Sequence, residues 1–277
     1  MRLQLPRSWR DRLELASRLG YAARGAVYLT IGVIAVLAAA DLTPRPAGTG
    51  DVLELWAKWP LGLFLISALA ACLLAFSGWR VLQAVFDADR HGATPKAWAI
   101  RAGQAVSGVV YGALALSALE LLDGLEDIGE ADETDSARTA AAEILAWPHG
   151  DWLVIAGGLV LLAVGVGNLA QGVLHDFGKR LHCGPEVCRW VVPLGRAGYI
   201  GRGLATLPLG IFLLRAGWEV RASEVRTWAD ALQTVEAQPF GSVILTAVAL
   251  GLIAFGLFGV VEAVFRRIDA PRDLSPT

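Results

Sequence analysis

Seven polar side chains lie within or beside the long hydrophobic runs of this sequence, where they could bind a charged or polar group. They are two arginines, one glutamate, two glutamines and two tyrosines: Arg24, Arg202, Glu262, Gln83, Gln171, Tyr21 and Tyr199. A charged side chain costs about 2.5–3.5 kcal/mol at the centre of a membrane helix, so such residues usually face the bundle interior in pairs. We therefore expect one polar layer. It is either a site for an anionic head group or polar solute, or a structural Arg–Glu–Gln network that locks helices together, which is the default interpretation.

A second set of candidate ligands, in the segment 175–190, resembles an incomplete zinc site: His175, His182, Cys183 and Cys188. Zinc sites use thiolate and imidazole ligands, with paired cysteines typically two to four residues apart. Four residues separate the two cysteines here, at the upper limit, and the adjacent His182 and Cys183 strain simultaneous ligation. We expect no metal site. Because the cytosol is reducing, we also expect two loop thiols rather than a disulfide.

The sequence lacks the motifs of the common enzyme classes. It contains no Gly-x-Ser-x-Gly, no Walker loop and no His-Glu-x-x-His. We therefore expect no catalytic residues and no cofactor. Small residues at helical spacing, such as Gly108 and Gly112, favour close helix packing instead, either within the chain or against a partner.

The elements that must position these side chains are membrane helices. Hydrophobic residues make up 55% of the 277 residues, charged residues make up 18%, and the mean hydropathy is +0.51. About 20 apolar residues cross a hydrocarbon core of roughly 30 Å, and the longest uncharged stretches cover residues 59–79, 102–119, 152–174 and 238–261. This composition excludes a soluble enzyme, a secreted disulfide scaffold and a disordered chain. The net charge of −2 provides no basic field for nucleic acid.

Three landmarks recur along the chain and indicate three copies of one unit. The first is Arg-x-Gly with a further Gly five residues later, in RLGYAARG, RAGQAVSG and RAGYIGRG from residues 18, 101 and 196. The second is Pro-x-Gly, at residues 60, 148 and 239, and the third is Gln or Glu 23 residues beyond each proline. Each unit predicts two helices. The expected fold is therefore an all-α membrane protein with six transmembrane helices, built from three tandem two-helix repeats with pseudo-threefold symmetry.

The landmarks also divide the chain and orient it. We place hairpin repeats at residues 18–90, 91–178 and 179–270, after an interfacial amphipathic helix at 1–17 and before a C-terminal tail at 271–277. Of the 24 Lys and Arg residues, 18 fall in the two terminal segments and the two loops on the same side. Basic residues favour the cytoplasmic side, so both termini are expected in the cytoplasm.

The RLGYAARG-type opening followed by Val-Tyr, together with the Pro-x-Gly opening of the second helix, resembles a bacterial membrane family catalogued as domain of unknown function 1206. The resemblance covers about residues 16–270, and the second copy departs from it at Gln104 and Ser107. It implies a multi-pass protein of the bacterial inner membrane with six helices. It implies no catalytic or binding residues.

Two functional hypotheses follow. The first is a non-enzymatic scaffold or accessory subunit of a membrane complex, with another membrane protein or a second copy of the chain as its partner in the lipid bilayer. The second is a transporter or channel for a small solute, ion or lipid, in which the polar layer lies on the cytoplasmic side. A membrane enzyme is disfavoured because no nucleophile is paired with a base.

Overall fold

Six long helices dominate the structure. The computed structural model describes residues 7–58, 60, 62–87, 92, 94–123, 133–175, 177 and 185–265, and no strand occurs among them. The long helices are α1 (Arg7–Ala39), α3 (Gly62–Phe86), α4 (Pro95–Asp123), α6 (Gly150–Leu174), α7 (Pro185–Glu219) and α9 (Gly241–Phe265). Each contains a segment long and apolar enough to cross a membrane, which agrees with the prediction of six such helices.

Short helices lead into the second long helix of each repeat. They are α2 (Thr49–Ala57), α5 (Glu133–Leu145) and α8 (Trp228–Glu236), with a 3₁₀ turn, η3 (Ala222–Glu224), before α8. The Thr227 hydroxyl accepts a hydrogen bond from the Asp230 amide, and the Asp230 carboxylate accepts one from the Thr227 amide. This reciprocal cap satisfies amides that the first turn of a helix leaves unpaired. It fixes where α8 begins.

The Pro-x-Gly landmark makes the corner between each short helix and the next long helix. The residue before the glycine adopts a left-handed conformation in two copies, with φ of 63° at His149 and 61° at Phe240. A Cβ on Gly150 would collide with the carbonyl oxygen of Ile144, and a Cβ on Gly241 would collide with that of Glu236. Only glycine therefore allows the long helix to start this close to the end of the short one.

The closest helix pairs join one repeat to the next. The most extensive contacts are between α6 and α7, between α1 and α9, and between α3 and α4. Each of these pairs combines the second long helix of one repeat with the first long helix of the following repeat, and α9 returns to α1. Helix α7 also packs on α9, and α1 packs on α3, whereas α4 and α6 make at most isolated contacts.

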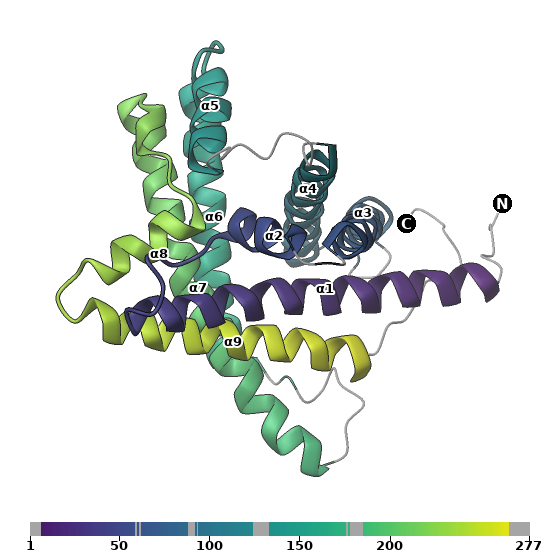
Figure 1. Ribbon diagram of the computed structural model, residues 1–277. Helices are drawn as coiled ribbons and strands as arrows, with labels where there is room; N and C mark the ends of the chain where they lie inside the picture. The colour runs from purple at the N-terminus through teal and green to yellow at the C-terminus, as the bar shows by residue number, and fades with distance from the viewer. Residues whose placement is uncertain are drawn as a thin grey trace.

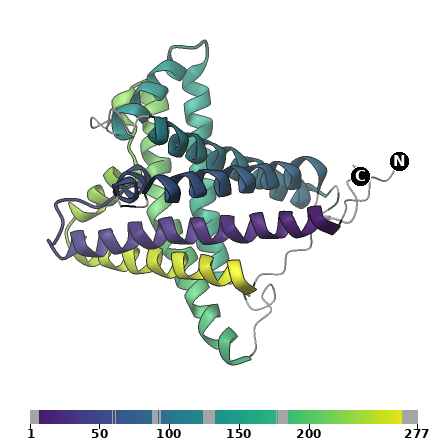
Figure 2. The ribbon, with the colours of Figure 1, turned by 45° about the vertical axis from the view of Figure 1, so that its right-hand side comes forward.

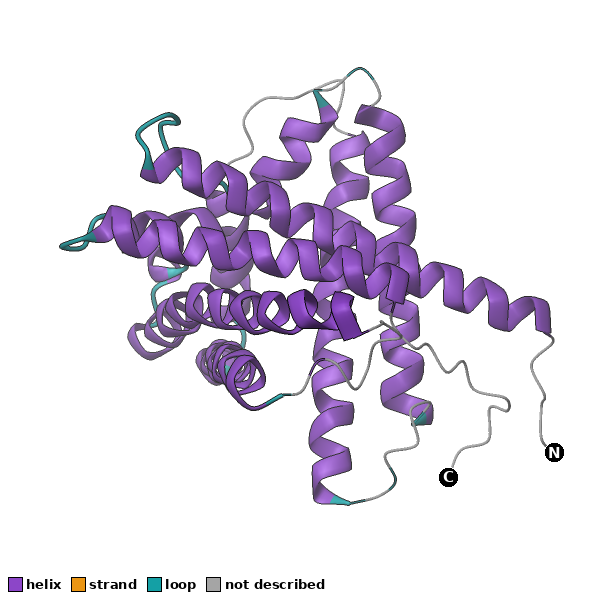
Figure 3. Cartoon of the chain, turned by 90° about the horizontal axis from the view of Figure 1, so that it is seen from below, coloured by secondary structure: helices purple, strands orange, loops and turns teal. Residues whose placement is uncertain are grey.

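The three pairs run in steeply different directions. In Figure 1, α1 and α9 lie across the view, α6 and α7 run nearly upright, and α3 and α4 are seen almost end-on. Figures 2 and 3 show the same crossing from two other sides. Side chains from all six long helices therefore meet where the pairs cross.

The first helix differs from the prediction. Residues 1–17 were expected to form a separate helix, but α1 is continuous from Arg7 to Ala39. Its segment able to cross a membrane is Arg18–Ala39, and the interfacial position of the residues before it stays a prediction. No proline lies between Pro6 and Pro44, so nothing in this stretch removes a helical hydrogen bond and breaks the helix. The remaining domain boundaries stay predictions.

Candidate functional site

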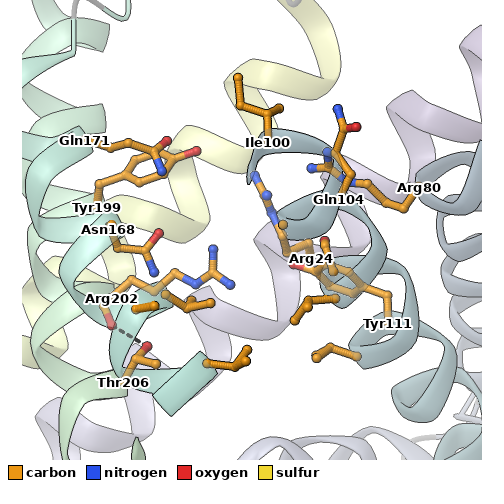
Figure 4. A pocket seen from close by; sticks show the side chains of 18 of the residues that line it. Arg24, Arg80, Ile100, Gln104, Tyr111, Asn168, Gln171, Tyr199, Arg202 and Thr206 are labelled. Carbon is orange, nitrogen blue, oxygen red and sulfur yellow. Dashed lines mark hydrogen bonds between the residues drawn. The ribbon is translucent and has the colours of Figure 1, made fainter. Parts of the chain in front are cut away.

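A cavity of about 1230 Å³ lies where the helix pairs cross. Its walls come from α3 and α4 on one side and from α6 and α7 on the other, and α1 and α9 contribute Arg24 and Glu262. Figure 4 shows the two walls facing each other. All seven polar residues selected from the sequence line this cavity: Tyr21, Arg24, Gln83, Gln171, Tyr199, Arg202 and Glu262. The structure thus brings the predicted polar layer together. That it binds a ligand stays a prediction.

Arg24 and Glu262 form a buried ion pair between the first and third repeats. Nη2 of Arg24 lies 2.6 Å from Oε2 of Glu262, and both side chains are almost fully buried. The Arg24 guanidinium also lies 5.1 Å from the centre of the Tyr21 ring and 4.9 Å from that of Phe255. The pair therefore neutralises one buried cation and ties α1 to α9.

Arg202 occupies the matching position of the third repeat but has different partners. Its guanidinium lies 5.3 Å from the Tyr28 ring centre and 4.8 Å from that of Phe255. Its side chain is hydrogen-bonded to Tyr28, and its buried Nε, like that of Arg24, has no hydrogen-bond partner. Within the part of the chain that the structure describes, it forms no ion pair with a carboxylate.

The repeat explains this difference between the two arginines. Since α1 packs on α9 as α7 packs on α6, the residue of α6 that corresponds to Glu262 is Gln171, 23 residues beyond the Pro-x-Gly proline in each case. Arg24 thus has a carboxylate at its matched position, whereas Arg202 has a neutral amide. The repeat therefore supplies no carboxylate to neutralise the guanidinium of Arg202.

A third guanidinium reaches the cavity from the opposite wall. Arg80 of α3 lies 5.0 Å from the Phe76 ring centre and donates a 3.3 Å hydrogen bond to Oε1 of Gln83. Three arginines and one glutamate line the cavity, so its side chains carry a net of two positive charges with His175 neutral. Asn168, only 4% exposed, adds an Nδ2 without a hydrogen-bond partner. The space between the walls is therefore rich in donors and poor in anions.

The set chosen from the sequence omitted several of these side chains, namely Arg80, Gln104, Tyr28, Tyr111 and Phe255, whereas the repeat register does indicate that Asn168 lies near the polar layer. The register could have found part of the omitted set: Arg80, like Asn168, lies three residues before the landmark glutamine, and Tyr28 and Tyr111 each lie three residues after the landmark glycine. No signal in the sequence marks Phe255, whose ring lies beside both Arg24 and Arg202.

The first arginine of the Arg-x-Gly landmark has a separate, structural role. Nη1 of Arg18 donates to the carbonyl oxygens of Ala263 and Val264, at 2.7 and 2.8 Å. Arg101 donates in the same way to Ala84 and Val85, at 2.7 and 2.9 Å. These carbonyls belong to the last turns of α9 and α3 and have no helical amide to accept from. The landmark arginine thus closes the end of the partner helix.

The last glycine of the landmark allows the paired helices to approach each other closely. A Cβ on Gly25 would lie 2.7 Å from the carbonyl oxygen of Gly256, and one on Gly203 would lie 2.9 Å from that of Gly165. Gly108, in the second copy, lies against α3, and its carbonyl accepts a 2.7 Å hydrogen bond from the Ser77 hydroxyl. The Gly108 face is therefore used within the chain.

The cysteines differ from the expectation. Cys188 is disulfide-bonded and its partner lies outside the described residues, whereas Cys72 is free. The expectation of two loop thiols is therefore wrong for Cys188, because it was based on the redox state of the cytosol and not on the geometry of the chain. Among the described residues, no three histidine, cysteine or acidic side chains cluster as metal ligands would. His182 and Cys183 lie outside those residues.

These features define a class of protein: an all-helical, multi-pass membrane protein with three helix pairs around a cationic cavity. The model of the family described as Domain of Unknown Function (DUF1206) matches residues 19–87, 102–175 and 197–266, and the chain belongs to this family. Each matched segment lies within one predicted repeat, which confirms that the chain contains three repeats.

One relative is the "Uncharacterized protein YxxB" of Bacillus subtilis (strain 168). It is 29% identical to this chain over 254 residues, which cover 91% of this chain and 90% of the relative. No solved structure matches the chain.

Proposed function

We propose that this protein binds an anion in the cavity between its helix pairs and serves as a transporter for it, in preference to a passive scaffold. The observation that supports this proposal is the cation of Arg202, which lies in the cavity without a carboxylate partner among the described residues. Removing an ion from water costs several kcal/mol if no opposite charge compensates it. An anionic ligand would supply the charge that Gln171 lacks.

The chemistry of the walls suits an anion. Arginine presents several N–H donors in a planar fork that matches carboxylate and phosphate oxygens. The four tyrosines of the lining, Tyr21, Tyr28, Tyr111 and Tyr199, add phenol groups, and Asn168 and Gln171 add amides. Arg24 and Glu262 use their charges on each other, whereas Arg202 has beside it the Tyr28 side chain and the Phe255 ring, both uncharged.

The scaffold hypothesis has less support. It was based on helix faces of small residues, such as Gly108 and Gly112, and on a polar layer at one side of the bundle. Both glycines lie against Ser77 of α3. Leucine at these positions would disturb the fold of the chain itself, so such variants could not report on a partner. Association with another membrane protein or with a second copy remains a prediction.

We also propose that the protein lies in the bacterial inner membrane with both termini in the cytoplasm, and that its repeats are related by pseudo-threefold symmetry. The distribution of Lys and Arg supports the orientation. The recurrence of one helix pairing at each repeat boundary supports the symmetry. Accessibility of a single cysteine introduced at Ser223, between α7 and α8, to an impermeant maleimide in intact cells tests the orientation. Labelling is expected, and protection would overturn it.

Arg202→Gln tests the anion site, with Arg221→Gln as its matched control. Arg221 is an exposed arginine outside the cavity whose removal changes the net charge equally. The purified protein in zwitterionic nanodiscs is titrated with inorganic phosphate and with phosphatidic acid, and the fluorescence of Trp79 and Trp228, which line the cavity, reports binding. Losing a charge-assisted contact of about 1.5–3 kcal/mol should weaken binding by roughly ten- to a hundredfold in Arg202→Gln only.

Two results would contradict the proposal. Equal affinities of Arg202→Gln and Arg221→Gln would remove the anion site. The second result is binding that depends on Arg202 without transport, that is, no flux of the bound probe into reconstituted vesicles above that into protein-free vesicles. It would show a binding protein and not a transporter.

A further inference from the structure

The lining of the cavity changes from polar to apolar along its length. Figure 4 shows Gln104 and Gln171 at one end of the space and Thr206 and Tyr111 at the other. Toward the second end, each wall helix contributes apolar side chains: Val110 from α4, Leu209 from α7, and Val160, Leu161 and Val164 from α6. The cavity is therefore amphipathic, with Arg80 close to Gln104 and Arg202 next to Thr206.

Little helix–helix contact closes the apolar end between α4 and α6. These two helices line the cavity from opposite sides and make at most isolated contacts with each other. Val110 and Val160, which line the cavity, are also 53% and 38% exposed. In a membrane this exposed surface faces hydrocarbon. The gap is a slot through which an apolar chain can lie partly in the cavity and partly in the bilayer.

The size of the cavity favours a ligand larger than a metabolite. Sites for small molecules typically enclose about 300–1,000 Å³, and this cavity has a volume of about 1230 Å³. A small anion alone would contact the arginines and leave the apolar end to water. An acyl or isoprenoid chain would cover Val110, Val160 and Val164 instead.

The charge of the lining selects among anionic head groups. The net of two positive charges comes from Arg80 and Arg202, since Glu262 neutralises Arg24. A phosphate monoester carries about −1.5 to −2 charge at pH 7 and presents three acceptor oxygens. A phosphodiester or a carboxylate carries a single charge and would leave one guanidinium unneutralised.

We infer that the cavity binds an amphiphile with a phosphate monoester head group, held between Arg80 and Arg202, whose apolar chain leaves through the slot between α4 and α6. This inference rests on the proposed anion site and names its ligand class. Both guanidiniums line the cavity and come from opposite walls (Figure 4), so a head group in this space lies between two charged donors.

Three probes separate the head group from the chain. Phosphatidic acid has the monoester and the chains, phosphatidylglycerol has the same chains on a diester, and glycerol 3-phosphate has the monoester without chains. Each is titrated against the full-length protein in zwitterionic nanodiscs, with binding measured by native mass spectrometry. Phosphatidic acid should bind at least about tenfold more tightly than either other probe. Arg80→Gln and Arg202→Gln should each reduce that preference over phosphatidylglycerol.

The slot has its own pair of variants. Val110→Trp places a large ring at the mouth of the slot and should weaken binding of phosphatidic acid at least about fivefold. Val109→Trp is the control, because Val109 is more exposed, at 71%, and does not line the cavity. Equal effects of the two variants would overturn the lateral slot.

The outcomes distinguish this inference from the proposed function. The ligand class is overturned if phosphatidylglycerol or glycerol 3-phosphate binds as tightly as phosphatidic acid. If that binding still depends on Arg202, the anion site stands. If no probe, inorganic phosphate included, binds in a way that depends on Arg202, both fail.

Discussion

Loss of the Glu262 carboxylate should destabilise the protein substantially, because it leaves Arg24 buried without a counter-ion. The two groups lie 2.6 Å apart and their side chains are 5% and 6% exposed. Breaking a buried ion pair by removing one partner costs about 3–5 kcal/mol. The rings of Tyr21 and Phe255 stay beside the guanidinium and offset about 1 kcal/mol of that cost. We therefore expect Glu262→Gln to lower the free energy of unfolding by about 2–4 kcal/mol.

A double-mutant cycle with Arg24→Gln measures the pair itself. Unfolding is followed by circular dichroism during titration with sodium dodecyl sulfate in mixed micelles. The double variant should be more stable than the sum of the single losses by about 2 kcal/mol, since neither charge is then left alone. Glu219→Gln serves as the control. Its exposed pair with Arg215, at 3.6 Å, should contribute less than about 1 kcal/mol.

Additive losses in the cycle would refute the ion pair. The same conclusion would follow if Glu262→Gln destabilised the protein no more than Glu219→Gln does. Either result would also count against the packing of α1 on α9, because that packing is what brings the first and third repeats to this contact.

Three further predictions test the helix packing and the disulfide. Gly25→Ala should destabilise the protein by about 1–3 kcal/mol, because the added Cβ would press against the α9 backbone. Gly78→Ala is the control, since a Cβ there meets nothing within 4 Å. It should be neutral or slightly stabilising in the same titration with sodium dodecyl sulfate. Arg101→Met should cost about 1–3 kcal/mol, because it leaves two carbonyls at the end of α3 without their charged donor, and faster hydrogen exchange should appear in the last turn of that helix. In protein purified without reductant, Cys188 should resist alkylation until the protein is reduced. Cys72 should react with maleimide once the protein is denatured, without any reductant, and peptide mass spectrometry distinguishes the two sites. Alkylation of Cys188 before reduction would contradict the disulfide.

The sequence was sufficient for the architecture because its signals are local. A run of about 20 uncharged residues predicts a membrane helix whatever its neighbours are. The capping residues Thr227 and Asp230 and the Pro-x-Gly corners act within a few residues of themselves. The register of the repeats predicted which seven polar residues form one layer, since matched positions in copies of one unit tend to lie at the same depth in the membrane. These inferences needed no knowledge of which helix packs on which.

Pairing across repeats could not be predicted in that way. The sequence places Arg202 and Glu262 in one repeat, yet the structure joins Glu262 to Arg24, 238 residues away. That choice depends on close backbone approach at Gly25 and on the carbonyls of α9 that Arg18 caps. Such contacts exist only once α1 and α9 lie together. Phe255 illustrates the same limit, since an apolar residue in an apolar helix carries no mark of the two cations beside it.

The sequence by itself thus determined that this is a helical membrane protein with three repeats and a polar layer, because hydrophobicity and local motifs act through the nearest residues along the chain. The packing of the helices, in contrast, determines that the layer encloses a cavity, that Arg24 is neutralised by Glu262, and that Arg202 has no matching carboxylate. Those properties arise from charges brought together by helices distant in sequence, and their balance depends on which helices pair.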